Sequence, residues 1–591
     1  MLRLSIFLLC STVLNMANGF TEIVDTKSGP IRGRVKSTIW YNKPYYSYRG
    51  IPYAKPPVGE LRFKAPEPVE KWTEIKNAFE YGIWCPQPSK KGKETSEDCL
   101  TLNVFVPILE QKKKLPVVFF LPGGSFASGS GSDFIYGPDF MMENEVILVT
   151  VNFRLGIFGF LSLGTPEYSG NMGLKDQQLA MKWAYDNIES FGGDNKKITL
   201  MGLSVGANSA GFHLLNNESS KCFNQILLLS GAPNKYHNYQ KGDHKCLMKE
   251  LYKKHNNGNP SDKTLIDFLK DVNASEIVNF FQETYVRKYS VWTPVVEKRS
   301  SIRPIIVDDP MTALEKTKSI NKTAYYTITK YEYLSLFEIG GTDYKDPTAV
   351  RNFIKDFNID LPIFGYKSII DKKPAYLKNV MKELHNYYFK FNESTPDQEL
   401  LRQRLMLDSD LYYAYTIEKW MERHVAISKK DTFYHRFSLH TIMNPHPEFP
   451  KDFPIAGHAE ELPYAFTTTL YFYNAKKVIE NKDIDQDHAK AFKAMNMVQK
   501  LYTNFIKYGK PIHNDDLMTE EFKPIERSSK ADEFDFVDVT NSGLIAGKGL
   551  TEGRTKFLDQ IIEKVKHLVE SHGDVPKKTQ IEQLHDMKYP K

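Results

Sequence analysis

The stretch Ile198-Thr199-Leu200-Met201-Gly202-Leu203-Ser204-Val205-Gly206 decides the fold. Its first four residues are typical of a buried strand, and the small residues of 207–211 begin a helix. Glycines two before and two after a serine fit a tight strand-to-helix turn, because Cβ atoms there would clash across the turn. The serine oxygen then stands clear of the sheet, beside the positive end of the helix. The pattern predicts that Ser204 is an activated nucleophile, and the flanking strand and helix disfavour the alternative of a structural Gly/Ser turn.

Short apolar runs recur outside this stretch, at 117–121, 146–151, 226–229, 324–328 and 432–437. Strands buried on both faces have such runs, which predicts a mainly parallel sheet covered by helices. Residues 174–190 carry apolar side chains at helical spacing between two runs, as a crossover helix of a strand-helix-strand unit would. We expect helical insertions at 262–279 and 349–428, and an amphipathic helix docked on the body at 557–569. The predicted class is α/β, with a large, mostly parallel central sheet flanked by helices.

Length and composition restrict the kind of protein further. The chain has 591 residues, 41% of them hydrophobic and 25% charged, which fits an enzyme-sized globular protein and excludes disordered, collagenous and multi-span membrane classes. The 78 basic and 72 acidic residues are nearly balanced, whereas binding to a phosphate backbone needs a clear basic excess. We therefore expect no nucleic-acid partner.

The amino terminus has the pattern of a signal peptide. Arg3 precedes an apolar run over 4–14 that contains Cys10, and Ala17-Asn18-Gly19 supplies the small-residue cleavage pattern. A membrane anchor is disfavoured because the run is shorter than the roughly 20 residues of a spanning helix. We therefore interpret 1–19 as the signal peptide of a secreted, extracellular protein without a membrane span.

The cysteine count and the glycosylation sequons of the remaining chain also agree with export. We expect one domain over 20–573 and a polar tail over 574–591. Removal of the leader leaves an even number of cysteines, which can pair in an oxidising compartment. Four sequons are candidates for glycosylation, and their asparagines are Asn217, Asn273, Asn321 and Asn392.

A glycine-rich turn offers a second part of the site. Pro122-Gly123-Gly124-Ser125-Phe126 follows the first strong strand, one strand before the unit that carries Ser204. When a serine attacks an ester, aimed amide N–H groups stabilise the oxyanion that forms. The amides of Gly124, Ser125 and Val205 are our candidates for this oxyanion hole. A Gly-Gly pair after a strand is more often only a turn, but its position favours the functional interpretation.

A serine nucleophile also needs a base and an acid, which in this kind of site follow it in the order acid, then histidine. His458 is the candidate base, in a loop after the strand predicted at 432–437. Glu332 is the candidate acid, because it follows the run ending near Thr329, at the sheet edge where open α/β sheets carry functional groups. Glu338 and Asp343 lie nearby, and spacing alone does not choose among the three.

Together these stretches resemble the type-B carboxylesterase/lipase family of α/β-hydrolases, which includes the cholinesterases. The resemblance runs from about Gly29 to at least Phe466. It rests on 50–63 and 96–104, which look like two family signatures, and on the segments 152–156, 170–177 and 191–194 before the nucleophile. It implies an α/β-hydrolase fold with helical insertions.

The resemblance implies Ser204 as nucleophile, Glu332 as acid and His458 as base of a serine carboxylesterase that works through an acyl-enzyme. It also implies a small-molecule ester substrate and needs no metal or other cofactor. A disulfide between Cys85 and Cys99 is implied, with an Arg62–Glu97 ion pair beneath it. The two other cysteines of the mature chain are a candidate second pair, Cys222 and Cys246.

Several residues depart from the family pattern. Leu203 precedes the nucleophile where relatives commonly have Glu, Gln or His, and Pro122 and Ser125 alter the glycine-rich turn, but the backbone amides survive these changes. The loop 86–98 contains no aromatic residue to hold a quaternary ammonium, which disfavours choline esters. Leu203 also replaces the Gln usual in juvenile hormone esterases, which disfavours that substrate.

Two other functions stay open. The family contains adhesion proteins that keep the fold but have lost the triad, and lipases acting on acylglycerols differ in lid and acyl pocket rather than in the triad. The sequence makes no prediction of oligomeric state.

Overall fold

The structure is a computed structural model that describes residues 19–574, with gaps at 89–93, 112, 236–238, 285–291, 337–345, 358, 360, 362–366, 371, 445–455, 469–477, 479–484 and 514–520. Nearly all of the predicted signal peptide, at 1–18, and most of the polar tail, at 575–591, lie outside the described residues. In the described part, no helix combines the length and apolar character needed to cross a bilayer.

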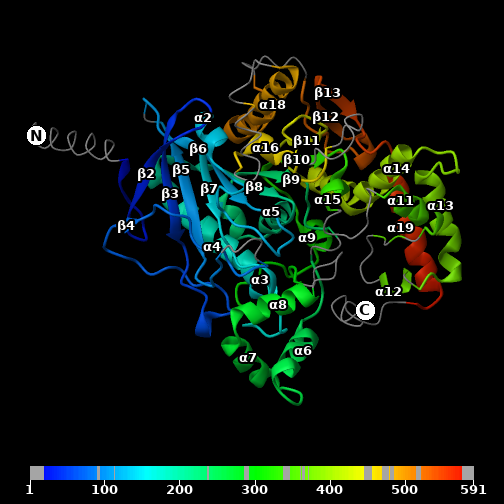
Figure 1. Cartoon of the computed structure of the whole chain (residues 1–591), viewed down its shortest axis with the longest axis horizontal. Coiled ribbons are helices and arrows are strands. Elements are labelled where there is room, and N and C mark those ends of the chain that lie inside the picture. Colours follow the sequence, from blue (N-terminus) through cyan, green and yellow to red (C-terminus); the bar gives the residue numbers. More distant parts are fainter. Residues whose placement is uncertain are drawn as a thin grey trace, which may run out of the picture.

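The centre of the molecule is a sheet of 13 strands in the order β1-β2-β3-β5-β7-β6-β8-β9-β10-β11-β12-β13, with β4 paired to β2 (Figure 1). The neighbours from β7 to β12 all pair in parallel. The bounds are β1 Phe20–Asp25, β2 Pro30–Ser37, β3 Pro44–Pro52, β4 Lys76–Asn77, β5 Thr101–Pro107, β6 Leu115–Leu121, β7 Ile147–Val151, β8 Gly193–Leu203, β9 Gln225–Leu229, β10 Thr323–Thr329, β11 Thr432–Phe437, β12 Asp535–Thr540 and β13 Gly543–Lys548. The predicted large, mostly parallel central sheet is confirmed.

Antiparallel strands extend the parallel centre at both ends. β1, β2, β3, β5 and β7 pair antiparallel in turn, and so do β12 and β13. The apolar runs did not indicate most of these strands, because strands such as β2 alternate buried and partly exposed residues.

Helices cover both faces of the sheet and produce two separate cores. On β6, Val117, Phe119 and Leu121 belong to one core, while Val118 and Phe120 belong to the other. The first core includes residues of α4 (Met172–Asn187), α5 (Val205–Leu215) and α15 (Tyr415–Ile427). The second includes residues of α2 (Asp139–Glu143), α16 (Leu462–Ala465) and α18 (Gln486–Tyr508). The crossover helix predicted at 174–190 corresponds to α4 and the short 3-10 turn that follows it.

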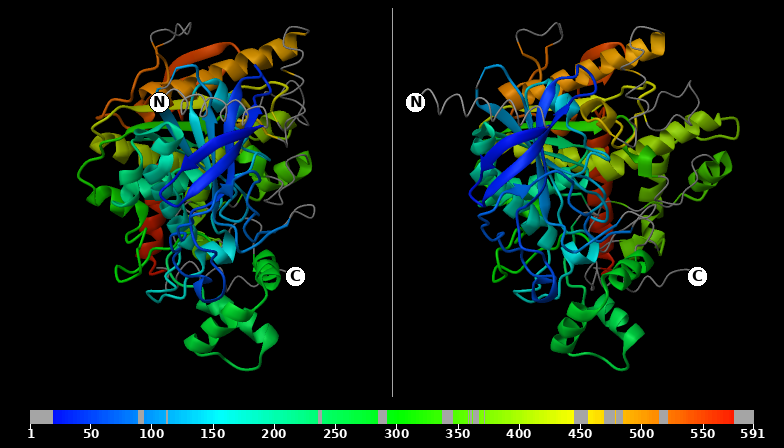
Figure 2. Two further views of the ribbon diagram at one scale, coloured as in Figure 1. Left: turned by 90° about the vertical axis from the view of Figure 1, so that its left-hand side faces the viewer. Right: turned by 60° about the vertical axis from the view of Figure 1, so that its left-hand side comes forward.

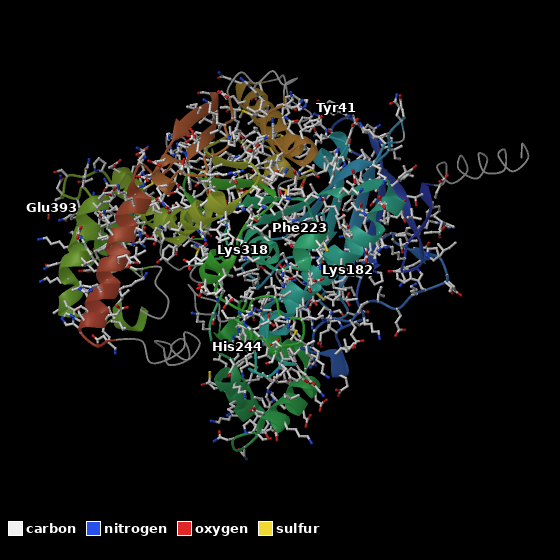
Figure 3. The ribbon with its side chains drawn as sticks, turned by 180° about the vertical axis from the view of Figure 1, so that it is seen from behind. Tyr41, Lys182, Phe223, His244, Lys318 and Glu393 are labelled. Carbon is white, nitrogen blue, oxygen red and sulfur yellow. A yellow bond between two sulfur atoms is a disulfide. The ribbon has the colours of Figure 1, made fainter. Side chains whose placement is uncertain are left out.

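Two groups of helices project from this body (Figures 1 and 2). The first contains α6 (Lys245–His255), α7 (Asp262–Asp271) and α8 (Ala274–Thr284), and the second contains α11 (Pro347–Lys355), α12 (Lys367–Ile370), α13 (Lys378–Tyr388) and α14 (Asp397–Ser409). Figure 3 shows the separation, with His244 just before the first group and Glu393 at the outer edge of the second. Two further short helices are α3 (Gly156–Phe160) and α9 (Pro310–Lys316). The helical insertions predicted at 262–279 and 349–428 are therefore present.

The last helix, α19 (Arg554–Ser571), binds the second group to the body. Its residues Leu558, Ile561, Val565 and Val569 are fully buried in a core shared with α11, α13 and α14. This confirms the amphipathic helix predicted at 557–569.

Candidate active site

Ser204 lies at the sharp turn between β8 and α5, with φ +55° and ψ −122°. Such a conformation costs roughly 1–3 kcal/mol for a residue other than glycine. A Cβ on Gly202 would lie 2.2 Å from the Gly206 carbonyl oxygen, and one on Gly206 would lie 2.1 Å from the Leu121 carbonyl oxygen. The glycines therefore have the steric role that the sequence pattern predicts, and the turn holds a strained serine at the end of a parallel strand.

The glycine-rich turn after β6 passes directly beside this serine. A Cβ on Gly123 would lie 3.4 Å from the Cβ of Ser204, and one on Gly124, whose φ is +116°, would lie 2.0 Å from the Ser128 carbonyl oxygen. Among the described residues, the amides of Gly124 and Ser125 donate no hydrogen bond. Val205 is the first residue of α5, where a helix has no internal acceptor for the N–H. Within the described ranges, the three candidate oxyanion amides thus have no acceptor and remain available to an oxyanion.

Glu332 and His458 are in direct contact. Glu332 is fully buried in the short helix η4 (Glu332–Leu336) that follows β10. Its Oε1 accepts the Thr329 N–H at 2.7 Å, and its Oε2 lies 2.6 Å from His458 Nδ1. Glu338 and Asp343, the two rival acids, lie outside the described residues. Glu332 is thus the one candidate acid that the structure describes, and it lies beside the imidazole.

Main-chain contacts hold the histidine loop against the end of β10. The Tyr331 N–H donates to the Ala456 carbonyl at 2.9 Å. The Glu460 carboxyl accepts from the Gly457 N–H at 2.9 Å and from Asn444 Nδ2 at 2.7 Å, and burial raises its pKa to about 7. The loop that carries His458 is therefore fixed by buried bonds.

Four further residues surround the Glu332–His458 pair, and the sequence patterns did not indicate them. Glu461 accepts from Ser230 Oγ at 3.3 Å, and burial, followed by the charge of Glu332, raises the Glu461 pKa to about 8. The Tyr413 ring lies 4.9 Å from the His458 ring, centroid to centroid, and the Lys235 ammonium lies over Tyr413. No motif marks these residues, because distant loops and helices bring them together.

The Cys85–Cys99 disulfide is present, with Cα atoms 5.1 Å apart, and so is the ion pair beneath it. Arg62 Nε donates to Glu97 Oε2 at 2.7 Å, and Arg62 Nη2 also contacts Glu97 Oε1.

The candidate second disulfide, Cys222–Cys246, is wrong, because the structure has both thiols free. Cys222 is buried in the core that includes residues of α4, α5 and α15. Cys246 packs against the separate core of α6, α7 and α8.

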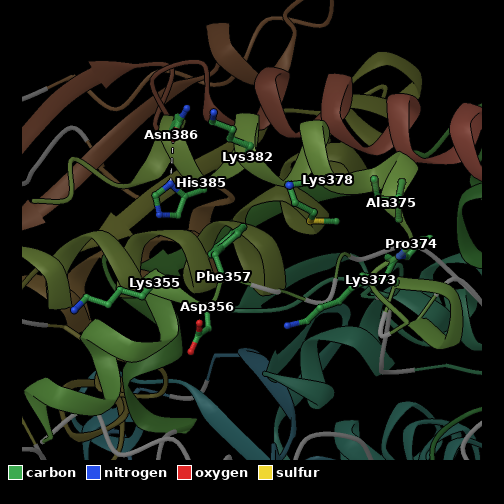
Figure 4. A pocket seen from close by; sticks show the side chains of 13 residues that line it. Lys355, Asp356, Phe357, Lys373, Pro374, Ala375, Lys378, Lys382, His385 and Asn386 are labelled. Carbon is green, nitrogen blue, oxygen red and sulfur yellow. Dashed lines mark hydrogen bonds between the residues drawn. The ribbon is translucent and has the colours of Figure 1, made fainter.

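A hollow away from this site has a volume of about 770 Å³ (Figure 4). It lies between the end of α11, α12 and α13, with Phe357, Leu377 and Met381 among its apolar lining. Lysines contribute to its lining at 355, 373, 378 and 382. The described residues that line it include no serine or cysteine, so they offer no hydroxyl or thiol nucleophile.

Comparison with known proteins adds an independent observation. The model of the carboxylesterase family matches residues 21–544, nearly the whole described chain. The chain belongs to the carboxylesterase family. The match contains every candidate site residue from Gly124 to His458.

Several relatives of this carboxylesterase-family chain are named as esterases or ester hydrolases. A juvenile hormone esterase of Tribolium castaneum is 38% identical over 50% of this chain and 52% of its own length. A carboxylic ester hydrolase of Bombus ignitus is 34% identical over 60% of this chain and 65% of its own length. Venom carboxylesterase-6 of Apis mellifera is 29% identical over 70% of this chain and 74% of its own length. The first two matches thus span about half and just under two thirds of those relatives.

Proposed function

We propose that this protein is a secreted serine carboxylesterase, with Ser204 as nucleophile, His458 as base and Glu332 as acid. The proposal depends mainly on the contact between Glu332 Oε2 and His458 Nδ1. This contact occurs in a chain of this family whose Ser204 lies on a strained turn. Membership of the carboxylesterase family and the names of the relatives support it.

The mechanism follows from the roles of these groups. Glu332 accepts the Nδ1 proton of His458, so Nε2 is the nitrogen that can take the Ser204 proton as the hydroxyl attacks the ester carbonyl. The amides of Gly124, Ser125 and Val205 stabilise the tetrahedral oxyanion. The alcohol leaves with the proton from His458, and water then repeats the sequence and releases the acid from the acyl-enzyme.

Of the two alternatives, an adhesion protein fits less well and a lipase stays open. An adhesion protein has no need for a strained serine or for a buried Glu–His contact, and both are present here. A lipase would share these groups, so substrate tests must separate it from a carboxylesterase.

Secretion is supported by the signal-peptide pattern at 1–19, by the Cys85–Cys99 disulfide and by the accessibility of the glycosylation sites. The sequon asparagines Asn217, Asn273, Asn321 and Asn392 are all exposed. We propose that the mature protein is an extracellular glycoprotein.

Hydrolysis assays test the proposal. The wild type should hydrolyse 4-nitrophenyl butyrate faster than acetylthiocholine or emulsified tributyrin. Ser204→Ala should lose the activity, and Ser542→Ala, which removes an exposed hydroxyl far along the sequence, should keep it. A wild type that turns over none of the three esters would favour an adhesion protein, and a preference for the emulsion would favour a lipase.

A further inference from the structure

Lys235 lies close to the reacting groups although no motif contains it. It ends a turn that follows β9, in which its N–H donates to the Ala232 carbonyl at 3.2 Å. Gly231, at the start of this turn, passes so close to Ser204 that a Cβ on it would lie 2.4 Å from the Ser204 carbonyl oxygen. The turn therefore runs alongside the nucleophile.

The ammonium of Lys235 and the imidazole of His458 both lie against the ring of Tyr413. Its Nζ lies 3.2 Å from the Tyr413 ring centroid, and that ring lies 4.9 Å from the His458 ring. The ammonium is thus at most about 8 Å from the imidazole centre. Tyr413 belongs to a π-helical turn, Asp410–Ala414, between α14 and α15, and such turns often occur at functional sites.

Among the described residues, no carboxylate pairs with this ammonium. In the part of the chain that the structure describes, Lys235 Nζ makes no ion pair or hydrogen bond. The side chain is half-buried, and burial lowers its pKa to about 7, although the charge of Glu332 opposes this shift. A cation in such a place is stabilised when an anion reaches its N–H donors.

The acidic residues that the structure describes in this region leave the ammonium of Lys235 available to an anion from outside. Glu332 already uses both oxygens, one on the Thr329 amide and one on His458. The pKa values of Glu460 and Glu461 are raised to about 7 and about 8, so Glu461 is largely uncharged at neutral pH. Tyr413, a described titratable residue in contact with Lys235, stays neutral because burial raises its pKa.

We propose that Lys235 is a specificity-determining residue that binds an anionic group of the substrate beside the reacting ester. The inference rests on the proposed function and narrows it. The preferred substrates are esters that carry a second, ionised carboxylate a short distance from the scissile carbonyl, such as monoesters of short dicarboxylic acids.

Pairs of esters of equal shape and different charge test the inference. On the acyl side, 4-nitrophenyl hydrogen glutarate is compared with 4-nitrophenyl 5-methylhexanoate, and on the alcohol side 4-acetoxybenzoate is compared with 4-isopropylphenyl acetate. The measured quantity is the ratio of kcat/KM for the anionic ester to that for the neutral ester, so a general loss of folded enzyme cancels.

Lys235→Met should lower this ratio about 10-fold or more in at least one pair, the range expected for a lost charged hydrogen bond. Lys235→Arg should retain it, and the control Lys318→Met, which removes an exposed lysine labelled in Figure 3, should not change it. In the wild type the ratio should fall as pH rises through 7, because the ammonium loses its proton.

Ratios that stay the same in Lys235→Met for both pairs would overturn the inference while leaving the esterase proposal intact. A wild type that hydrolyses none of the four esters would overturn the proposed function, and this inference with it.

Discussion

Replacing Gly202 by alanine tests the turn that presents Ser204. The new Cβ would lie 2.2 Å from the Gly206 carbonyl oxygen, 2.3 Å from its carbon and 2.6 Å from the Ala207 nitrogen, all of them backbone atoms. Ordinary contact begins at 3.4 Å, so strand and helix must separate by more than 1 Å. A misplacement of about 1 Å in a catalytic group costs about 100-fold in rate. We therefore expect kcat/KM for 4-nitrophenyl butyrate to fall at least about 100-fold in Gly202→Ala.

The assay must separate a displaced nucleophile from an unfolded enzyme. Gly202→Ala should remain soluble, with a far-ultraviolet circular dichroism spectrum close to that of the wild type. Gly258→Ala is the matched control, because a Cβ on this exposed glycine meets no atom within 4 Å, although its φ of +89° disfavours alanine. It should cost about 1 kcal/mol of stability and leave kcat/KM unchanged. A folded Gly202→Ala enzyme with wild-type kcat/KM would refute the steric reasoning.

Three further predictions follow from the contacts described above. Glu332→Gln should lower kcat about 10³- to 10⁴-fold with little change in KM, because the imidazole loses the partner that fixes its tautomer; steady-state kinetics with wild-type kcat would move the acid's role to Glu338 or Asp343. Glu418 is fully buried beside Thr551, and burial raises its pKa to about 8, so the free energy of unfolding should decline as pH rises from about 5 to 8. Glu418→Gln should flatten this decline in urea titrations, and an identical pH slope in wild type and variant would contradict the assignment. Removing the disulfide by Cys85→Ser with Cys99→Ser should cost about 3 kcal/mol in the same titrations, and an unchanged midpoint would show that the closed loop does not stabilise the fold.

The sequence predicted the centre of the fold because its signals there are local. Strands buried on both faces give continuous apolar runs, such as 117–121 in β6, and the turn at Ser204 needs glycines at fixed positions for steric reasons. Parallel strands also place their carboxyl ends at one edge, which is why Glu332 after β10 was a candidate beside Ser204 after β8.

What the sequence did not predict depends on contacts between distant segments. Outer antiparallel strands such as β2 alternate buried and partly exposed residues, so they leave no apolar run. Lys235 and Tyr413 meet only because the turn after β9 and the π-helical turn before α15 are packed together. An even number of cysteines permitted a second disulfide, but Cys222 and Cys246 belong to different cores.

The most direct test of the central claim is the identity of the nucleophile. The protein is treated with a fluorophosphonate, which reacts covalently with activated serines, and the modified peptide is identified by mass spectrometry. We predict one phosphonylated residue, Ser204, together with complete loss of ester hydrolysis and no labelling of Ser204→Ala. Labelling of Ser204→Ala equal to that of the wild type, or inhibition with the adduct on another residue, would contradict the account.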